Sequence, residues 1–271
     1  MSMPGSKKSL RKKITISICI ALVIIVGVIV CCLINRAPQQ DTAAEPATAP
    51  AMSGNVEENT APTGDGTPYV DPNVDPSYYQ IINRSNPIEP NYIAGTGELT
   101  EIEGKQMETN AAAALAQMVA DLRGQGMDII IQSGYRTDSD QEFLYNRQIQ
   151  RQNGNEEKAA TISAKPLTSE HQAGLAVDLS VDGTLTEAFG STEQGKWLYA
   201  NCMNYGFILR YQKDKTEFTG IISEPWHFRF VGSKEQATAI MNSGMCMEEY
   251  FGNYLREEDI APYRAYLDEV Q

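Results

Sequence analysis

Two histidine-bearing motifs carry the residue types that could do chemistry in this chain, which has only two histidines. His171 lies in the stretch Ser-Glu-His-Gln-Ala-Gly-Leu-Ala-Val-Asp, which ends at Asp178, and His227 closes the tetrapeptide Glu-Pro-Trp-His, which begins at Glu224. Two imidazoles and a carboxylate suit a catalytic zinc site, which needs three protein ligands, an open position for water and a base. The alternative to metal binding is a purely structural role for either histidine.

The first motif predicts a strand that would place Asp178 beside an ion. From 175 to 180, Leu and Val alternate with smaller or polar residues, which is typical of a strand with one apolar face. Asp178 therefore points away from the core-facing side chains, among small neighbours that leave room for a metal. Gly174 lets the chain turn before the strand, so His171 can approach the same point from a loop.

The second motif predicts an irregular strand. Glu224 and His227 are three positions apart, so a regular strand would place their side chains on opposite faces. Pro225 lies between them and cannot donate to a central ladder, so we expect an edge or a bulge here. Such a bend would bring both side chains into one cleft. The alternative for Glu224 is an exposed carboxylate at the end of a strand.

The charge of the chain excludes one class of partner. The formal net charge is −13, and the six charged side chains that precede Asp41 are all basic. Of 22 basic residues, 16 are then left against 35 acidic ones, so the rest of the chain carries about −19. Phosphate binding needs a basic face, so the sequence predicts that nucleic acid is not a partner.

The N-terminal part predicts a membrane anchor followed by a tether. Residues 14–34 form an uncharged run of 21 residues, which is long enough to cross a bilayer as a helix. Basic residues crowd the segment 1–13, so we expect it in the cytoplasm and the rest of the chain outside. A cleaved signal peptide is the alternative, but no A-x-A-like site follows the run closely. Residues 35–77, which contain few large apolar side chains, predict a disordered extracellular linker.

Residues 78–271 predict one domain of the α+β class, in which helices flank a small, mostly antiparallel sheet. Apolar spacing favours helices at 110–123, from Thr137 onward, and at 192–204, 233–244 and 248–255, and strands at 127–132, 175–180, 207–210 and 226–231. Ser191 with Gln194, and Ser233 with Gln236, are expected to form capping boxes. The polar stretch 153–168 predicts a loop at the rim of the cleft.

The five cysteines do not form a metal-binding pattern, because no CxxC pair exists. Three of them lie in the N-terminal apolar run, and Cys202 and Cys246 lie in the predicted domain. These two either form a disulfide or remain buried thiols. The helical patterns around both favour thiols.

The two motifs together resemble those of the LAS-type zinc peptidases, and in particular the VanY-like D-alanyl-D-alanine carboxypeptidases. The pattern Ser-x-His-x-x-Gly-x-Ala-x-Asp begins at Ser169 and is followed by Glu-x-Trp-His at 224–227. The similarity runs from about residue 79 to 231 and includes Ser-Gly-Tyr-Arg at 133–136, Gln141 and the stretch 205–211. All motif positions are present, and the predicted anchor and linker lie outside it.

The resemblance implies a role for each matching residue. The ligands of a Zn²⁺ cofactor would be His171, Asp178 and His227. Glu224 would deprotonate the attacking water and pass the proton to the leaving amine, and Arg136 would stabilise the developing oxyanion. Ser169 and Gln141 would line the substrate pocket.

The sequence therefore predicts a membrane-anchored zinc D,D-carboxypeptidase that removes the terminal D-alanine from peptidoglycan stem peptides or their precursors. The same site would serve an L,D-carboxypeptidase, a D,D-dipeptidase or a peptidoglycan endopeptidase, and the shape of the pocket would decide among them. A non-catalytic wall-binding domain is a further alternative. A binding domain, however, has no need of a base such as Glu224 or of Arg136.

Overall fold

The chain divides into two units, residues 1–56 and 57–271, and the computed structural model describes residues 67–267 of the second. The predicted cytoplasmic segment, the anchor at 14–34 and most of the linker lie outside the described residues. Within 67–267, no helix is both long and apolar enough to cross a bilayer. At the end of the predicted linker, Asp71 is buried and accepts a hydrogen bond of 2.7 Å from the Ser233 hydroxyl.

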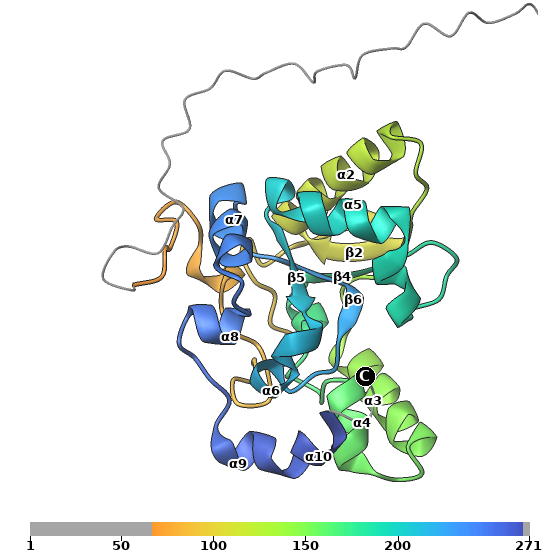
Figure 1. Cartoon of the computed structure of the whole chain (residues 1–271), viewed down its shortest axis with the longest axis vertical. Helices are drawn as coiled ribbons and strands as arrows, with labels where there is room; N and C mark the ends of the chain where they lie inside the picture. Colours follow the sequence, from red (N-terminus) through yellow and green to blue (C-terminus); the bar gives the residue numbers. More distant parts are fainter. Residues whose placement is uncertain (1–66, 268–271) are drawn as a thin grey trace, which may run out of the picture. The chain divides into compact units, whose positions relative to one another are not determined.

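The described part is an α+β fold with helices around small antiparallel sheets (Figure 1). The fold class was predicted, but the sequence predicted one sheet and the described residues form two. One sheet is the hairpin β1–β2, and the other has four strands in the order β3-β4-β6-β5. The strands are β1 (Leu99–Ile102), β2 (Lys105–Glu108), β3 (Ile130–Ser133), β4 (Ala176–Ser180), β5 (Phe207–Tyr211) and β6 (Glu224–Phe230). The α-helices are α2 (Thr109–Gly124), α3 (Asp138–Arg151), α4 (Glu156–Ile162), α5 (Glu193–Asn201), α6 (Thr216–Thr219), α7 (Lys234–Ser243), α8 (Met247–Tyr250), α9 (Glu257–Ile260) and α10 (Arg264–Leu267). Short 3₁₀ helices occupy Pro76–Tyr78, Glu170–Ala173, Glu187–Ser191, Cys202–Tyr205, Lys213–Lys215 and Ala261–Tyr263.

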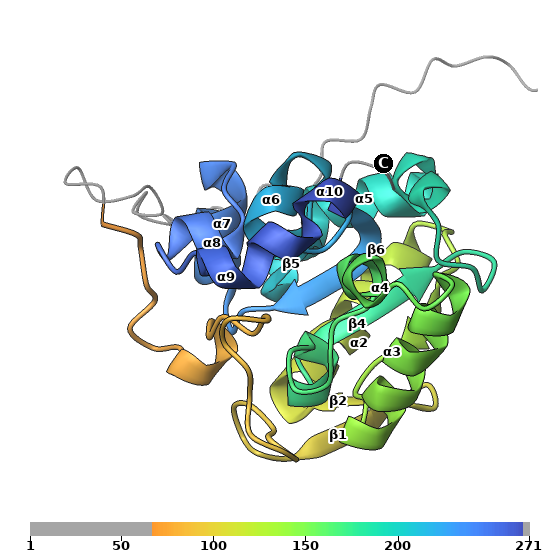
Figure 2. The ribbon, with the colours of Figure 1, turned by 90° about the horizontal axis from the view of Figure 1, so that it is seen from below.

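The four-stranded sheet has one apolar face and one polar face. Val177 of β4 and Phe228 of β6 belong to the main core, together with the apolar side chains of α2 and α5. The ribbon shows α2 and α5 on one side of the four-stranded sheet and α4 on the other (Figures 1 and 2). Side chains alternate between the faces of a strand, so Asp178, His227 and Arg229 lie on the other face. Every residue of β4 is buried. The polar face is therefore covered as well, and its charged groups must find partners inside the protein.

Strand pairing sets the positions of the two motifs. Asp178 lies directly opposite His227 in the antiparallel pair β4–β6, and Ser133 at the end of β3 lies opposite Asp178 from the other side. β6 begins at Glu224, two residues earlier than predicted. β4 pairs with β6 only from His227 onward, so Pro225 needs no N–H for that ladder. The expected irregularity lies in the pair β5–β6, whose register shifts before the pairing of Tyr211 with Glu224.

Three local predictions about the helices were wrong. The stretch 153–168 is not all loop, because it contains α4, which the Asn155 side chain caps by accepting a hydrogen bond from the Lys158 amide at 2.8 Å. The cap of α5 is Thr192 and not Ser191. The chain after 248 forms three short helices, α8 to α10, in place of the one segment expected.

Candidate metal centre

His171, Asp178 and His227 meet on the polar face of the sheet. All three are buried, and one ligand atom from each lies within 4.8 Å of the others. Nε2 of His171 is 3.3 Å from Oδ2 of Asp178, and Nδ1 of His227 is 3.3 Å from Oδ1. Two ligand atoms that share a tetrahedral zinc ion at ~2.1 Å lie about 3.4 Å apart, so the separation between His227 Nδ1 and Asp178 Oδ1 suits such an ion.

Each imidazole has a second partner that fixes which ring nitrogen faces this point. Nδ1 of His171 lies 2.7 Å from the carbonyl oxygen of Gly134, so a neutral ring that donates there leaves Nε2 free to bind a metal. Nε2 of His227 lies 3.2 Å from Oε2 of Glu170, which leaves Nδ1 for the metal. The two rings therefore present opposite nitrogens, with their planes at 89°.

Two glycines allow this close arrangement. A Cβ atom at Gly134 would lie 2.4 Å from the carbonyl oxygen of Gln106, so the chain beside His171 has no room for a side chain. Gly174 has a φ of +75° and ends the short helix that carries His171. Its left-handed conformation turns the chain into β4, as the sequence predicted.

The site also contains a buried acceptor that lacks a donor. Oδ1 of Asp178 is inaccessible to solvent and has no hydrogen-bond partner among residues 67–267. A buried polar atom in this state costs about 1–3 kcal/mol, and a cation beside it would remove the cost. Two imidazole nitrogens and one carboxylate oxygen form a ligand set that zinc prefers in catalytic sites, so these residues fit Zn²⁺.

Burial and charge act in opposite directions at the three candidate ligands. Burial lowers the pKa of His171 to about 4, and the positive charge of Arg136 adds to this effect. Burial alone would also lower the pKa of His227, but Asp178 and Glu170 raise it to about 9. Burial would raise the pKa of Asp178, yet the two histidines and Arg136 hold it well below its ordinary value. The acids therefore favour positive charge at the point where the ligands meet.

Glu224 stands beside the three candidate ligands, as expected for a base. Its Oε2 lies 3.4 Å from Nδ1 of His227, so the two side chains of the second motif do meet in one cleft. Burial raises the pKa of Glu224 to about 8. A carboxylate whose pKa lies near neutrality is suited both to accept and to return a proton.

Arg136 is held in place by two of the other predicted residues. Its Nη2 donates to Oδ2 of Asp178 at 2.8 Å, and its Nη1 donates to Oε1 of Gln141 at 3.1 Å. Gln141 is completely buried and does not line the cavity described below, although we expected it to contact substrate. Its amide nitrogen donates to the Ala164 carbonyl at 2.7 Å, so Gln141 lies behind Arg136 and orients it.

A cavity of about 290 Å³ adjoins the candidate ligands. Ser169, Arg136 and Glu224 line it, in agreement with their predicted positions. The sequence did not point to Trp226, or to Arg147 and Arg151 of α3, which also line it. The two arginines are four residues apart on a predicted helix, and this shared face was the available signal. They place positive charge at the cavity of a chain whose net charge is −13.

Comparison with known sequences identifies the family. Residues 104–233 match the family model VanY, described as D-alanyl-D-alanine carboxypeptidase. A D-alanyl-D-alanine carboxypeptidase of Enterococcus faecalis is 37% identical over 63% of this chain. The bifunctional D-Ala-D-Ala dipeptidase and D-Ala-D-Ala carboxypeptidase VanXYC of Enterococcus gallinarum is 33% identical over 63% of this chain and 92% of its own length. The match covers 64% of the Enterococcus faecalis protein and 55% and 46% of two further curated relatives.

Solved structures agree with this result. A mutant of the vancomycin resistance D,D-pentapeptidase VanY in complex with Zn(II) is 36% identical, with a TM-score of 0.56, over 64% of this chain and 98% of that one. The LD-carboxypeptidase LdcB is 34% identical, with a TM-score of 0.57, over 65% of this chain and 86% of that one. The motifs, the fold and these similarities agree, and the chain belongs to the VanY family of D-alanyl-D-alanine carboxypeptidases.

Proposed function

We propose that this protein is a zinc-dependent D,D-carboxypeptidase that hydrolyses the terminal D-alanine from peptidoglycan stem peptides. The observation that carries the proposal is the position of Glu224. Its carboxylate lines the cavity and lies 3.4 Å from Nδ1 of the candidate ligand His227. A domain that only bound wall peptides would have no use for a buried base at this place.

The chemistry divides between the ion and the chain. Zinc, when bound by His171, Asp178 and His227, polarises the scissile carbonyl and lowers the pKa of water toward neutrality. Glu224 takes the proton of the attacking water and returns it to the nitrogen of the leaving D-alanine. Arg136 presents its guanidinium to the oxyanion that develops on the carbonyl oxygen.

The cavity wall supports an anionic peptide as the substrate. Arg147 and Arg151 line the cavity on α3, and a stem peptide carries a terminal carboxylate. In a strongly acidic protein, cations at the mouth of the site attract the negatively charged substrate and raise its local concentration. Ser169, which is buried in the wall, would donate its hydroxyl to the bound peptide.

An L,D-carboxypeptidase is the second candidate. The similarity to the LD-carboxypeptidase LdcB, at 34% identity, is close to that with the D,D-pentapeptidase VanY, at 36%. The same ligands, base and arginine would serve either reaction, because both release one D-alanine from a peptide end. The two candidates differ only in the length and chirality of the peptide that fits the cavity.

We further propose that the enzyme is anchored in the cell membrane and faces the wall. The uncharged run at 14–34 and the basic segment 1–13 support a single span with a cytoplasmic N-terminus. The linker from residue 35 would let the catalytic domain reach peptides outside the cell. Membrane fractionation with protease treatment of intact cells tests this, because only an external domain is digested.

The decisive experiment offers two peptides to the purified full chain, with and without a chelator. One is a pentapeptide that ends in D-Ala-D-Ala, and the other is a tetrapeptide that ends in one D-Ala. Chelator-sensitive release of D-alanine from the pentapeptide supports the D,D-carboxypeptidase, and release from the tetrapeptide alone supports the L,D-carboxypeptidase. Zinc binding without cleavage of either peptide would overturn both assignments.

A further inference from the structure

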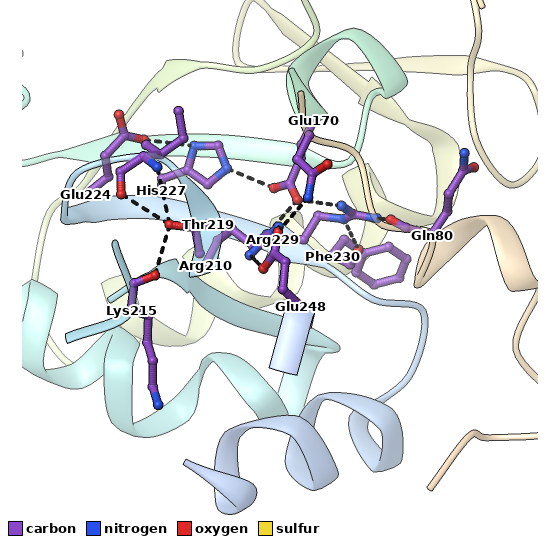
Figure 3. A network of polar contacts seen from close by, with 12 residues as sticks. Gln80, Glu170, Arg210, Lys215, Thr219, Glu224, His227, Arg229, Phe230 and Glu248 are labelled. Carbon is purple, nitrogen blue, oxygen red and sulfur yellow. Dashed lines mark hydrogen bonds and ion pairs between the residues drawn. The ribbon is translucent and has the colours of Figure 1, made fainter. Parts of the chain in front are cut away.

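Glu170 precedes one candidate ligand in the chain, but its side chain reaches the other. Its Oε2 lies 3.2 Å from Nε2 of His227, on the side of that ring opposite the metal-facing Nδ1 (Figure 3). The side chain of Glu170 is completely buried. A buried carboxylate must be matched by nearby donors, so its partners define what it does.

The two oxygens of Glu170 have separate tasks. Oε1 accepts hydrogen bonds from Nε of Arg210 at 2.6 Å and from Nη1 of Arg229 at 2.7 Å. Oε2 contacts His227, and it has no second partner among residues 67–267. Oε1 is thus occupied by the two arginines, and Oε2 remains directed at the imidazole of His227.

The arginines connect Glu170 to the outer parts of the domain. Arg210 donates twice to Glu248 of α8, at 2.7 and 2.8 Å (Figure 3). Asn83 donates to the same carboxylate at 3.0 Å. Arg229 donates to the carbonyl oxygen of Gln80 at 3.0 Å. Two arginines and two glutamates balance, so the buried network has no formal net charge. Both Asn83 and Glu248 lie outside the segment 104–233 that matches the family.

We propose that Glu170 is a positioning residue that holds the His227 ring with Nδ1 toward the metal, and that the network of Arg210, Arg229 and Glu248 holds Glu170 in turn. This inference rests on the proposed zinc site. It extends that site beyond its ligands to a buried structure that joins the N-terminal and C-terminal parts of the domain.

Two physical effects give Glu170 this role. A carboxylate that accepts the Nε2 proton fixes the tautomer of His227 and makes Nδ1 a stronger ligand, and loss of such a partner typically costs about 10–100-fold in metal affinity. Replacing the carboxylate with an amide also leaves the two arginines with one unbalanced positive charge close to the ion. Both effects weaken zinc binding.

The test compares two isosteric variants of the full chain, Glu170→Gln and Glu248→Gln. Each removes one negative charge from the same network, but only Glu170 touches His227. Competition with a chromophoric chelator measures zinc affinity, and the visible spectrum of the cobalt(II)-substituted protein reports ligand geometry. We expect Glu170→Gln to bind zinc about 10–100-fold more weakly with an altered cobalt spectrum. Glu248→Gln, which leaves the Glu170–His227 contact in place, should lose less zinc affinity than Glu170→Gln and keep the wild-type cobalt spectrum.

Side-chain NMR gives an independent readout, because the chain has only two histidines. In the zinc-loaded wild type, His171 should carry its proton on Nδ1 and His227 on Nε2. In Glu170→Gln, the Nε2 proton of His227 should exchange faster with water and shift upfield, while the His171 signals stay unchanged. Identical His227 signals in wild type and Glu170→Gln would overturn the proposal.

Circular dichroism and thermal unfolding show whether each variant folds. A third variant, Glu170→Asp, tests positioning, because it keeps the charge of the network but withdraws the carboxylate from His227. Zinc affinity in Glu170→Asp that equals wild type, or equal losses in Glu170→Gln and Glu248→Gln, would overturn the proposal. Absence of zinc binding by the wild-type protein would instead contradict the proposed function itself.

Discussion

Nη2 of Arg136 lies 2.8 Å from Oδ2 of Asp178, so a cation of the cavity wall is bound to a candidate metal ligand. Nε of Arg136 also donates to the Ser133 hydroxyl at 3.1 Å, and Nη1 donates to Gln141. Three bonds from one planar group fix the guanidinium before substrate arrives. Such a preorganised cation stabilises a developing oxyanion without further rearrangement.

Replacing Arg136 with lysine should therefore lower kcat although the charge is kept. A lysine ammonium cannot make the three fixed bonds of the guanidinium, so the cation is no longer aimed at the oxyanion. We expect kcat to fall about 10²–10³-fold with a smaller change in KM. The matched control is Arg123→Lys at the exposed end of α2, which should leave kcat unaltered. Wild-type kcat in Arg136→Lys would contradict the oxyanion role.

Replacing Glu224 with glutamine should abolish turnover while zinc remains bound. The amide cannot accept a proton from water, and loss of a general base typically costs about 10²–10⁴-fold in rate. The measurements are kcat and the zinc content of the purified variant. Glu187→Gln, at an exposed carboxylate, serves as the control and should match wild type in both. Retained turnover in Glu224→Gln would assign the base elsewhere.

Removing the metal should lower thermal stability as well as activity. The candidate ligands Asp178 and His227 belong to neighbouring strands, so an ion would tie β4 to β6. A ligand at 100 times its Kd stabilises the folded state by about 2.7 kcal/mol, which corresponds to ~5–10 °C in Tm for a domain of this size. We expect a chelator to produce this drop and added zinc to reverse it. In Asp178→Asn, zinc should leave Tm unchanged, and an equal zinc response in that variant would contradict the site.

Stability at alkaline pH should depend on Cys202. Cys202 and Cys246 are free and buried, which confirms the thiols favoured by the sequence, and burial raises the pKa of Cys202 from 9.0 to about 12. The unfolded chain therefore releases this proton at a lower pH than the folded protein does. The free energy of unfolding is unaffected below about pH 9 and falls by about 1.4 kcal/mol per pH unit above it.

Urea unfolding between pH 7 and 11 measures this effect. Cys202→Ala should be less stable than wild type at pH 7, because it leaves a small cavity, but the difference should narrow as the pH rises above 9. Other ionising groups contribute equally to both proteins and cancel in the comparison. A constant difference across the range would show that the thiol is not held neutral in the folded state.

Local patterns were sufficient to predict much of the site. The alternation around Asp178 predicted that its side chain lies on the sheet face opposite Val177, and the turn at Gly174 predicted that His171 approaches Asp178. The structure confirms both predictions. These features depend on residues close in sequence, where strand periodicity and backbone sterics decide the outcome. The same local information, from the Asn155 cap and the buried Ala159, was present for α4, but the polar composition around it obscured the helix.

Partners that are distant in sequence could not be predicted in this way. Gln141 was expected at the substrate, and only the fold places the Ala164 carbonyl and Arg136 on either side of its amide. Likewise, Glu170 stands inside the first motif, but its contacts with Arg210 and Arg229 arise from strand register 40 and 59 residues away. A single sequence does not state which buried charges will be neighbours.

The wall formed by α3 and α4 has a hydrophobic cluster of its own. Tyr145, Ala159 and Ala160 pack together there, separately from the main core beneath the four-stranded sheet. Arg147 and Ile162 line the cavity from this wall, whereas the candidate ligands stand on the sheet and the turn before it. Mutations of these two lining residues can therefore reshape the cavity without removing a contact of the ligands. Selection can therefore change which peptide the enzyme accepts while the metal ligands stay the same.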